Sequence, residues 1–337
     1  MKRSFALLLL SLLTLLGTSA QTVSNVTAEQ VDKTIHVSYD LDMQAEISLH
    51  LSIDGGKTYT QLYKVSGDVG KNITEGHKTI IWDVLAKREN LVGDEVLFKV
   101  KAEQSENLYF TVNGVTFKMI YVEGSTFTMG CTPEQGRDCL DDEKPSHSVK
   151  LDDFYIGETE VTQALWEAVM ENNPSGFKNE NHPVEYVSWN DCQKFLQKLN
   201  SLTGKTFRLP TEAEWEYTAR GGNMSIGYKY AGGNFLNDIA CYANTTTSAV
   251  KMKLPNELGL YDMSGNVWEW CSDWYSNSYY GPSFSINPQG PSSGLGRVLR
   301  GGCWTSGAVL CRVTSRTHND PDTHNDRCGF RLALDLE

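Results

Sequence analysis

Two cysteines near the end of the chain, Cys303 and Cys311, are the side chains best suited to chemistry, and they lie in the stretch GGCWTSGAVLC. Paired thiolates can hold a soft metal ion such as copper(I), provided that their geometry suits the ion. In an oxidising compartment two thiols can instead form a disulfide. The stretch therefore leaves three interpretations open: an oxidative metal site, a disulfide, or two buried thiols.

The other cysteines predict one local bond. Cys131 and Cys139 enclose the polar, turn-rich sequence TPEQGRD, which favours a disulfide between them. The pairing of the rest cannot be chosen from the sequence. These are Cys192, Cys241, Cys271, Cys303, Cys311 and Cys328.

The histidines do not indicate a hydrolytic site. His318 and His324 match no spacing that is typical of zinc ligands. None of the seven histidines stands in an HExxH motif or beside a nucleophile elbow. Hydrolysis therefore has no support in the sequence.

The N-terminal residues predict export. Lys2 and Arg3 precede an apolar run over 7–16, and small residues follow as far as Ala20, which is typical of a cleavable signal peptide over 1–20. No later apolar run is long enough for a transmembrane segment, and no cysteine at the cleavage point would carry a lipid. We expect a protein of the periplasm, the outer surface or the extracellular space.

Charge excludes one class of partner. The chain has 30 basic and 42 acidic side chains, for a net charge of -12. Such a chain repels phosphate backbones, so nucleic acid is not an expected partner.

The chain is long enough for two domains. Short alternating strands predict an immunoglobulin-like or fibronectin-like all-β sandwich over 21–104, in which Ile47, Leu49 and Leu51 share one face. After a polar break, the sequence becomes rich in glycine, aromatic residues and loops. It predicts a loop-rich α+β domain over 108–337.

The helix signals in the second domain are few. Helical spacing and capping residues predict helices in TQALWEAVM, in SWNDCQKFLQKLN and in PTEAEWEYTARGG. The last segment contains Glu212, Glu214 and Glu216, which could act as acids or bases. Capping and a solvated helix face explain these carboxylates more simply.

Six motifs, in order, carry a family resemblance: FYIGETEVTQALW, HPVEYVSWNDC, RLPTEAEWEY, PNELGLYDMSGNVWEW, RVLRGG and CGFRLAL. Over roughly residues 116 to 335 the chain resembles the sulfatase-modifying-factor family, that of the formylglycine-generating enzymes. The resemblance implies a compact, loop-rich relative of the C-type lectin fold. Activity has to be argued separately, because one fold hosts many functions.

The resemblance also implies where copper would bind in an active member. Family enzymes oxidise a cysteine of sulfatases with copper held by two thiolates, but Ser306 stands where the first thiolate is expected. Cys303 takes the place of a family serine, and Cys311 need not match the second thiolate. We therefore expect the copper dithiolate to be lacking. The alternative is a formylglycine-generating oxidase that uses Cys303 and Cys311 and acts on a cysteine-containing sulfatase.

A calcium site transfers more directly from the family. The resemblance matches the side chains of Asp262 and Glu269, and the carbonyl groups of Gly265 and Val267, to calcium ligands. Calcium prefers such oxygen donors. The simpler interpretation is that Asp262 only hydrogen-bonds its own turn.

The final loops have an unusual composition. Residues 305–328 contain no Lys, Glu, Gln, Met or Trp, and every residue type present can be encoded by a codon ending in a pyrimidine. This pattern resembles the variable proteins of diversity-generating retroelements, which diversify asparagine codons. The predicted ligand-binding residues are Trp304, Thr305, Ser306, Thr317, His318, Asn319, Asp320, Thr323, His324, Asn325 and Asp326.

Recognition of a protein or glycan ligand through these loops is our leading hypothesis for function. Short polar side chains adapt their hydrogen bonds to many ligands. An ordinary polar surface loop explains the composition equally well. Beside the copper oxidase, a third possibility is a structural part of a secretion or surface apparatus.

Overall fold

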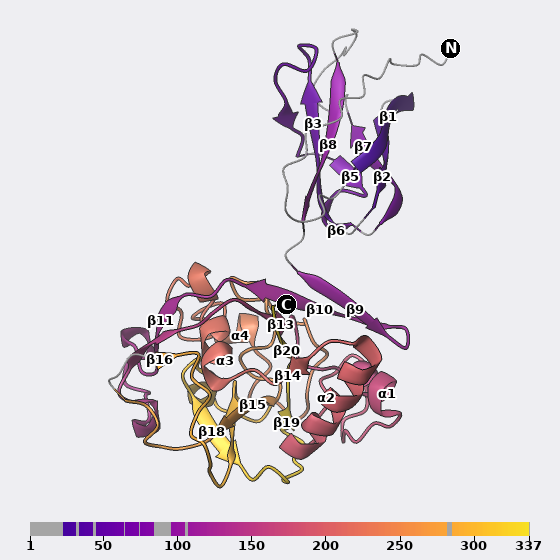
Figure 1. Cartoon of the computed structure of the whole chain (residues 1–337). Coiled ribbons are helices and arrows are strands. Elements are labelled where there is room, and N and C mark those ends of the chain that lie inside the picture. The colour runs from indigo at the N-terminus through magenta and orange to yellow at the C-terminus, as the bar shows by residue number, and fades with distance from the viewer. Residues whose placement is uncertain are drawn as a thin grey trace. The chain divides into compact units, whose positions relative to one another are not determined.

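The computed structural model describes residues 23–31, 34–42, 45–63, 65–73, 75–83, 96–104, 107–281 and 285–336 (Figure 1). The signal peptide expected over 1–20 lies outside these ranges. The chain divides into two compact units, Met1–Glu106 and Asn107–Glu337. No helix of the described ranges is both long enough and apolar enough to cross a membrane.

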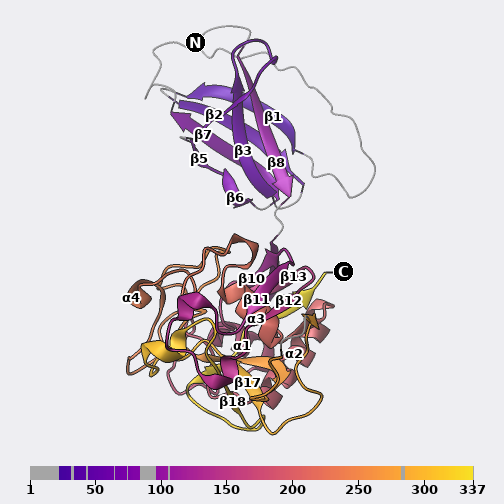
Figure 2. The ribbon, with the colours of Figure 1, turned by 90° about the vertical axis from the view of Figure 1, so that its left-hand side faces the viewer.

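The described residues of the N-terminal unit form two antiparallel sheets. The first contains β1 (Val23–Val31), β2 (Thr34–Leu41), β7 (Gly76–Asp83) and β5 (Val65–Gly67), in that order. The second contains β4 (Thr60–Gln61), β3 (Ala45–Ser52) and β6 (Gly70–Ile73), with β8 (Leu97–Gln104) beside β3 (Figure 2). Ile47 and Leu49 are buried as predicted, whereas Leu51 is only partly buried.

Three sheets and many loops build the C-terminal unit. The largest sheet has the order β14 (Phe207–Arg208), β20 (Ala333–Asp335), β13 (Phe154–Gly157), β10 (Val115–Val122) and β9 (Leu108–Val112). A second has the order β11 (Thr126–Met129), β12 (His147–Lys150) and β16 (Ser285–Ile286). The third has the order β18 (Arg316–Asn319), β17 (Arg297–Arg300), β15 (Trp268–Trp274) and β19 (Cys328–Gly329).

The predicted helices are confirmed. They are α1 (Gln163–Met170), α2 (Trp189–Thr203) and α3 (Glu212–Ala219), and a fourth short helix, α4, spans Leu236–Ile239. Ser188 and Thr211 cap α2 and α3 by accepting a hydrogen bond from the third backbone N–H of each helix. The α+β, loop-rich class predicted for this region is therefore correct.

The solvated face predicted for α3 is wrong. Glu212, Glu214 and Glu216 are all buried. Their partners are arginines: Arg208 and Arg220 flank α3 in the sequence, whereas Arg300 and Arg316 come from distant segments. Burial by itself would raise the pKa of Glu212, but the charges of Arg316 and Arg300 outweigh it and hold that pKa below its ordinary value. Sequence alone could not reveal distant cations, so these glutamates resembled surface residues.

Candidate recognition surface and thiol cluster

The two cysteines singled out from the sequence are buried, free thiols. Cys303 follows β17 and its Sγ lies 3.3 Å from Thr305 Oγ1 and 3.3 Å from Ser306 Oγ. The Ser306 hydroxyl oxygen also accepts a hydrogen bond of 3.0 Å from the backbone N–H of Cys303. The side chains of Cys303 and Ser306 are therefore neighbours.

Cys311 ends a short 3-10 helix, Ala308–Cys311, and packs against the backbone of Gly302. Gly302 has a φ of 79°, and a Cβ there would lie 2.9 Å from Cys311 Sγ, so this close approach requires glycine. Burial, followed by the neighbouring Cys303 and Cys241, raises the pKa of Cys311 to about 12. At neutral pH Cys311 is therefore a protonated thiol.

The donors available to a soft copper(I) ion at these positions are one hydroxyl oxygen and thiol groups. The hydroxyl of Ser306 is a hard donor, and it already accepts from the backbone N–H of Cys303. A metal-bound Cys311 would have to lose the proton that burial favours. Cys303 and Cys241 are the neighbouring cysteines that act on Cys311.

The predicted ligand-binding residues differ in exposure. Thr305, His318, Asp320 and His324 are exposed, and the following are partly exposed: Thr317, Asn319, Thr323, Asn325 and Asp326. Trp304 and Ser306, which were predicted to contact a ligand, are instead buried, and their side chains contact other residues of the domain. The Trp304 ring meets Phe177 edge to face at 5.2 Å, and its Nε1 donates to the Asp326 carbonyl oxygen.

Segment 317–326 is held by contacts along its length. The His318 ring stacks on Tyr275 with 4.1 Å between the ring centroids. His324 Nε2 lies 2.7 Å from Asp191 Oδ2. The Asn325 carbonyl oxygen accepts from the Tyr186 backbone N–H. These contacts fix the course of the segment and leave polar side chains at the surface.

An aromatic border, which sequence reasoning missed, adjoins this segment. The guanidinium of Arg297 lies 3.9 Å from the Trp189 ring centroid and 3.6 Å from that of Trp274. Arg297 pairs with Asn319 across β17 and β18, and the half-exposed Tyr186 ring lies 6.1 Å from His324. The aromatic residues in the sequences VSWND and SDWY could have indicated this border.

The residues expected to bind calcium lie in a buried acidic cluster. Asp262 accepts a 2.9 Å hydrogen bond from the Lys251 backbone N–H. Both Glu269 oxygens accept from Arg331, at 2.6 and 2.7 Å, and one also accepts from Trp215 Nε1. Burial raises the pKa of Asp262 to about 6.

Glu160 is a further member of this acidic cluster that the sequence did not indicate. It accepts from the side chain of Asn266 and is completely buried. Burial first, and then the charges of Asp262 and Glu269, raise its pKa well above the ordinary value. Arg331 pairs directly with Glu269, and the charges of Glu160 and Asp262 act on it as neighbours. Among the described residues, no three His, Cys, Asp or Glu side chains are arranged to hold a metal ion.

Comparisons with known proteins agree with this architecture. The family model described as "Sulfatase-modifying factor enzyme 1-like domain" matches residues 109–336. The formylglycine-generating enzyme of Streptomyces coelicolor is 33% identical over 289 residues, covering 65% of this chain and 89% of that protein. The serine/threonine-protein kinase pkn1 of Chlamydia pneumoniae is 33% identical over 281 residues, covering 75% of this chain and 43% of that protein.

Solved structures give the same result. Treponema denticola variable protein 1 has a TM-score of 0.61 and 34% identity, covering 68% of this chain and 99% of that one. PvdO from Pseudomonas aeruginosa has a TM-score of 0.57 and 27% identity, covering 65% and 94%. The match over 109–336, with the buried cluster and loops described above, shows that this chain belongs to the sulfatase-modifying-factor family.

Proposed function

We propose that the C-terminal unit is a ligand-recognition module that contacts a protein or glycan through residues 317–326 and the adjoining aromatic border. The observation that carries this proposal is the anchored segment itself. His318 and His324 are held by Tyr275 and Asp191, while polar side chains around them face solvent. A rigid backbone carrying short polar and aromatic side chains loses little entropy on binding.

Similarity to a variable protein supports the proposal. Treponema denticola variable protein 1 is matched over 99% of its length. The restricted composition of residues 305–328 agrees with diversification of this segment. Diversification requires a second, asparagine-rich copy of the coding segment near the gene, so sequencing that region tests this part of the proposal.

The binding test replaces exposed side chains of segment 317–326 and keeps the contacts that anchor its backbone. Residues Thr317, Asp320 and Thr323, which are not among the anchoring histidines, are changed together to alanine or serine, and wild-type and variant are applied to arrays of glycans and of extracellular proteins. We expect the wild-type signals to be lost while the melting temperature changes by no more than about 2 °C. A matched control changes Thr245 and Asn244, which are exposed in another loop of the same unit. Identical binding by wild-type and the surface variant would refute the recognition surface.

The second candidate function is copper-dependent oxidation of a sulfatase cysteine to formylglycine. It is favoured by the proximity of Cys303 and Cys311 and by the similarity to the Streptomyces coelicolor enzyme. Bound copper would supply oxygen activation, while Cys303 and Cys311 would hold it. Incubation with copper(I), oxygen and a cysteine-containing sulfatase peptide tests this function. Aldehyde formation that Cys311→Ser abolishes would establish it, and copper binding without turnover would exclude it.

Calcium is proposed as a structural ion rather than a reactant. Asp262 and the carbonyl groups of Gly265 and Val267 would bind it, while Glu269 is shared with Arg331. Chelation should lower the melting temperature, because an ion that binds only the folded state stabilises it. Asp262→Asn should remove this sensitivity. An unchanged melting temperature after chelation would contradict the proposal.

Export is also proposed, from the charged and apolar pattern of residues 1–20. A Cys131–Cys139 disulfide is consistent with an oxidising compartment. Cell fractionation, with signal cleavage measured by mass spectrometry of the N-terminus, tests the location. A structural role in a secretion or surface apparatus would instead give stable co-purification with its components.

A further inference from the structure

We propose that residues 131–144, here named the strap, position the recognition surface, with Asp142 and Glu143 as the positioning residues. The inference rests on the proposed function for its biological meaning, because it concerns what holds segment 317–326 in place. The strap contains the Cys131–Cys139 disulfide and ends just before β12. Its inner face contacts the chain between Cys311 and the recognition segment.

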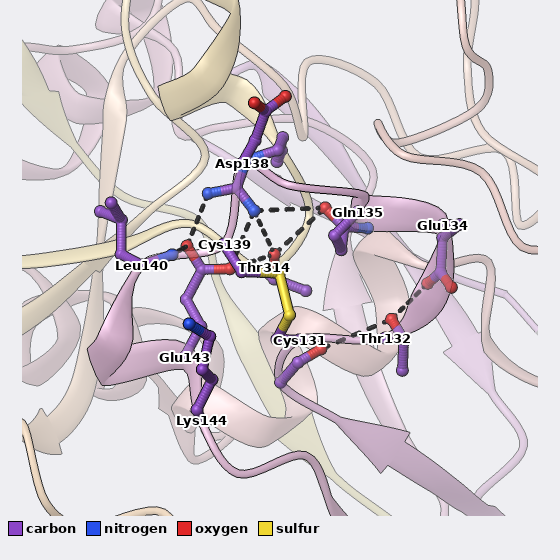
Figure 3. The surroundings of a disulfide bond; sticks show 12 residues. Cys131, Thr132, Glu134, Gln135, Asp138, Cys139, Leu140, Glu143, Lys144 and Thr314 are labelled. Atoms are coloured by element: carbon purple, nitrogen blue, oxygen red, sulfur yellow. Dashed lines mark hydrogen bonds and ion pairs between the residues drawn. A yellow bond between two sulfur atoms is a disulfide. The ribbon is translucent and has the colours of Figure 1, made fainter.

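Glu143 is the first point of attachment. Its carboxylate is buried and accepts from both terminal nitrogens of Arg312, at 2.8 and 2.5 Å. It also accepts a 2.7 Å hydrogen bond from the Thr314 hydroxyl. Figure 3 shows Glu143, Gln135 and Thr314 gathered beside the disulfide. Because charge-assisted bidentate pairs constrain direction, Glu143 fixes the path of residues 312–314.

Asp142 is the second point of attachment, and it leads directly to the surface. Its backbone carbonyl oxygen accepts from Arg316, the first residue of β18, at 3.0 Å. Its carboxylate accepts a 2.7 Å hydrogen bond from the Tyr275 hydroxyl. The Tyr275 ring in turn stacks on His318. Asp142 therefore sets the orientation of an exposed residue of the recognition segment through one intermediate ring.

The disulfide closes the strap around these attachments. The Cys131 backbone N–H donates to the Glu143 carbonyl oxygen at 2.8 Å, so the start and end of the strap are joined. The bond between Cys131 and Cys139 limits the conformations that the intervening residues can adopt when local contacts open. Within this closed loop, Gln135 Oε1 also lies 3.1 Å from the Thr314 hydroxyl oxygen. Opening the disulfide should loosen the hold on residues 312–318.

Reduction is a clean perturbation of this arrangement. The six other cysteines are already free thiols in the described structure. A dithiol reductant transfers two electrons to the Cys131–Cys139 bond, giving two protonated thiols and its own cyclic disulfide. Reduced protein and the double variant Cys131→Ser with Cys139→Ser should therefore behave alike.

The experiment follows the surface without a ligand. Hydrogen exchange is measured for amides of residues 312–319 in wild-type, Glu143→Gln, the double cysteine variant and reduced protein. Imidazole NMR signals of His318 are followed in the Asp142→Ala and Tyr275→Phe variants. We expect exchange to accelerate about tenfold or more in the segment. We also expect the His318 signals to shift in Asp142→Ala, which removes the acceptor of the Tyr275 hydroxyl, and in Tyr275→Phe, which retains the stacked ring.

A matched control separates positioning from general loss of stability. Leu165→Ala in α1 removes a buried side chain from a core cluster that contains no residue of the strap or of β18. It should accelerate exchange broadly and leave the His318 signals unchanged. Protection of residues 312–319 that stays at the wild-type level in the strap variants would overturn the inference, as would changes no different from those of Leu165→Ala. If the strap variants show the expected faster exchange but wild-type protein binds nothing on the glycan and protein arrays, the positioning role of the strap stands and the proposed recognition function is refuted.

Discussion

The cores of the two units are stabilised in different ways. In the described part of the N-terminal unit, the buried side chains are apolar apart from His50 and Ser52; Ile47, Leu49 and Ile80 are examples. The C-terminal unit buries four arginines: Arg300, Arg312, Arg316 and Arg331. Each is paired with a buried glutamate.

Backbone geometry explains this difference. Strands satisfy their own N–H and C=O groups by pairing, so a sandwich needs only apolar side chains inside. Loops leave carbonyl groups unpaired, and buried arginines supply donors to them. Arg331 donates to the carbonyl oxygen of Tyr261 in a loop and to that of Gly157 at the end of β13, and Arg300 donates to that of Val313. The buried arginines of this unit therefore have two roles: they donate hydrogen bonds to carbonyl groups that no strand pairs, and they balance the charge of buried glutamates.

Removing one such arginine should have the largest effect. Arg331→Met leaves the buried Glu269 without its cation, with Trp215 Nε1 as a remaining donor, and takes a donor from two carbonyl oxygens; it should cost about 3 to 5 kcal/mol of unfolding free energy. Urea denaturation of the C-terminal transition measures it. The double variant with Glu269→Leu should recover part of the loss. A cost below about 1 kcal/mol for Arg331→Met would show that the arginine is not required for the loop carbonyl groups.

An apolar truncation in the N-terminal unit should cost slightly less. Leu49→Ala removes a fully buried side chain and should cost about 2 to 5 kcal/mol, through lost transfer free energy and a cavity. Differential scanning calorimetry should show the loss in the transition of the N-terminal unit. Ile53→Ala, at an exposed position beyond β3, is the control and should change little.

A pH-dependent difference should follow from Asp273. Burial first, and then the charge of Glu212, raise the pKa of Asp273 to about 7. Because its pKa in the unfolded chain is near 3.8, the folded state binds the extra proton between these values, and this contribution is lost as pH rises through about 7. Asp273→Asn can still accept from the Glu212 backbone N–H. Relative to wild-type, its stability should therefore rise by about 1 to 3 kcal/mol from pH 5 to pH 8, measured by urea denaturation. A difference that does not vary with pH would argue against a buried, titrating Asp273.

The smallest effect should come from an exposed ion pair. Lys194 lies 2.9 Å from Asp191 on the first turns of α2, and its side chain is largely solvent-exposed. Lys194→Ala should lower the melting temperature only slightly, and by less at high salt. Thermal melts at two salt concentrations measure this. A cost approaching that of Arg331→Met would remove the distinction between buried and surface pairs.

Local features of the fold could be predicted from the sequence. Capping residues such as Ser188 and Thr211 fix helix starts because they act within a few residues, and these predictions were correct. Six ordered motifs determined the family and its fold class, because such motifs are recognisable without coordinates. The exposed positions His318 and His324 were also in the predicted set.

Contacts between residues distant in the sequence became apparent in the folded structure. The burial of Glu212 beside Arg316, and of Trp304 beside Phe177, could not be read from local patterns, since each pair is joined by long-range folding. The same holds for the contacts from Asp142 to Tyr275 and on to His318. Chain neighbours and spacing encode secondary structure, whereas the partner of a buried charge is chosen by packing across the whole domain. The physical reason is that a buried charge is stable only when folding brings a group of opposite charge next to it.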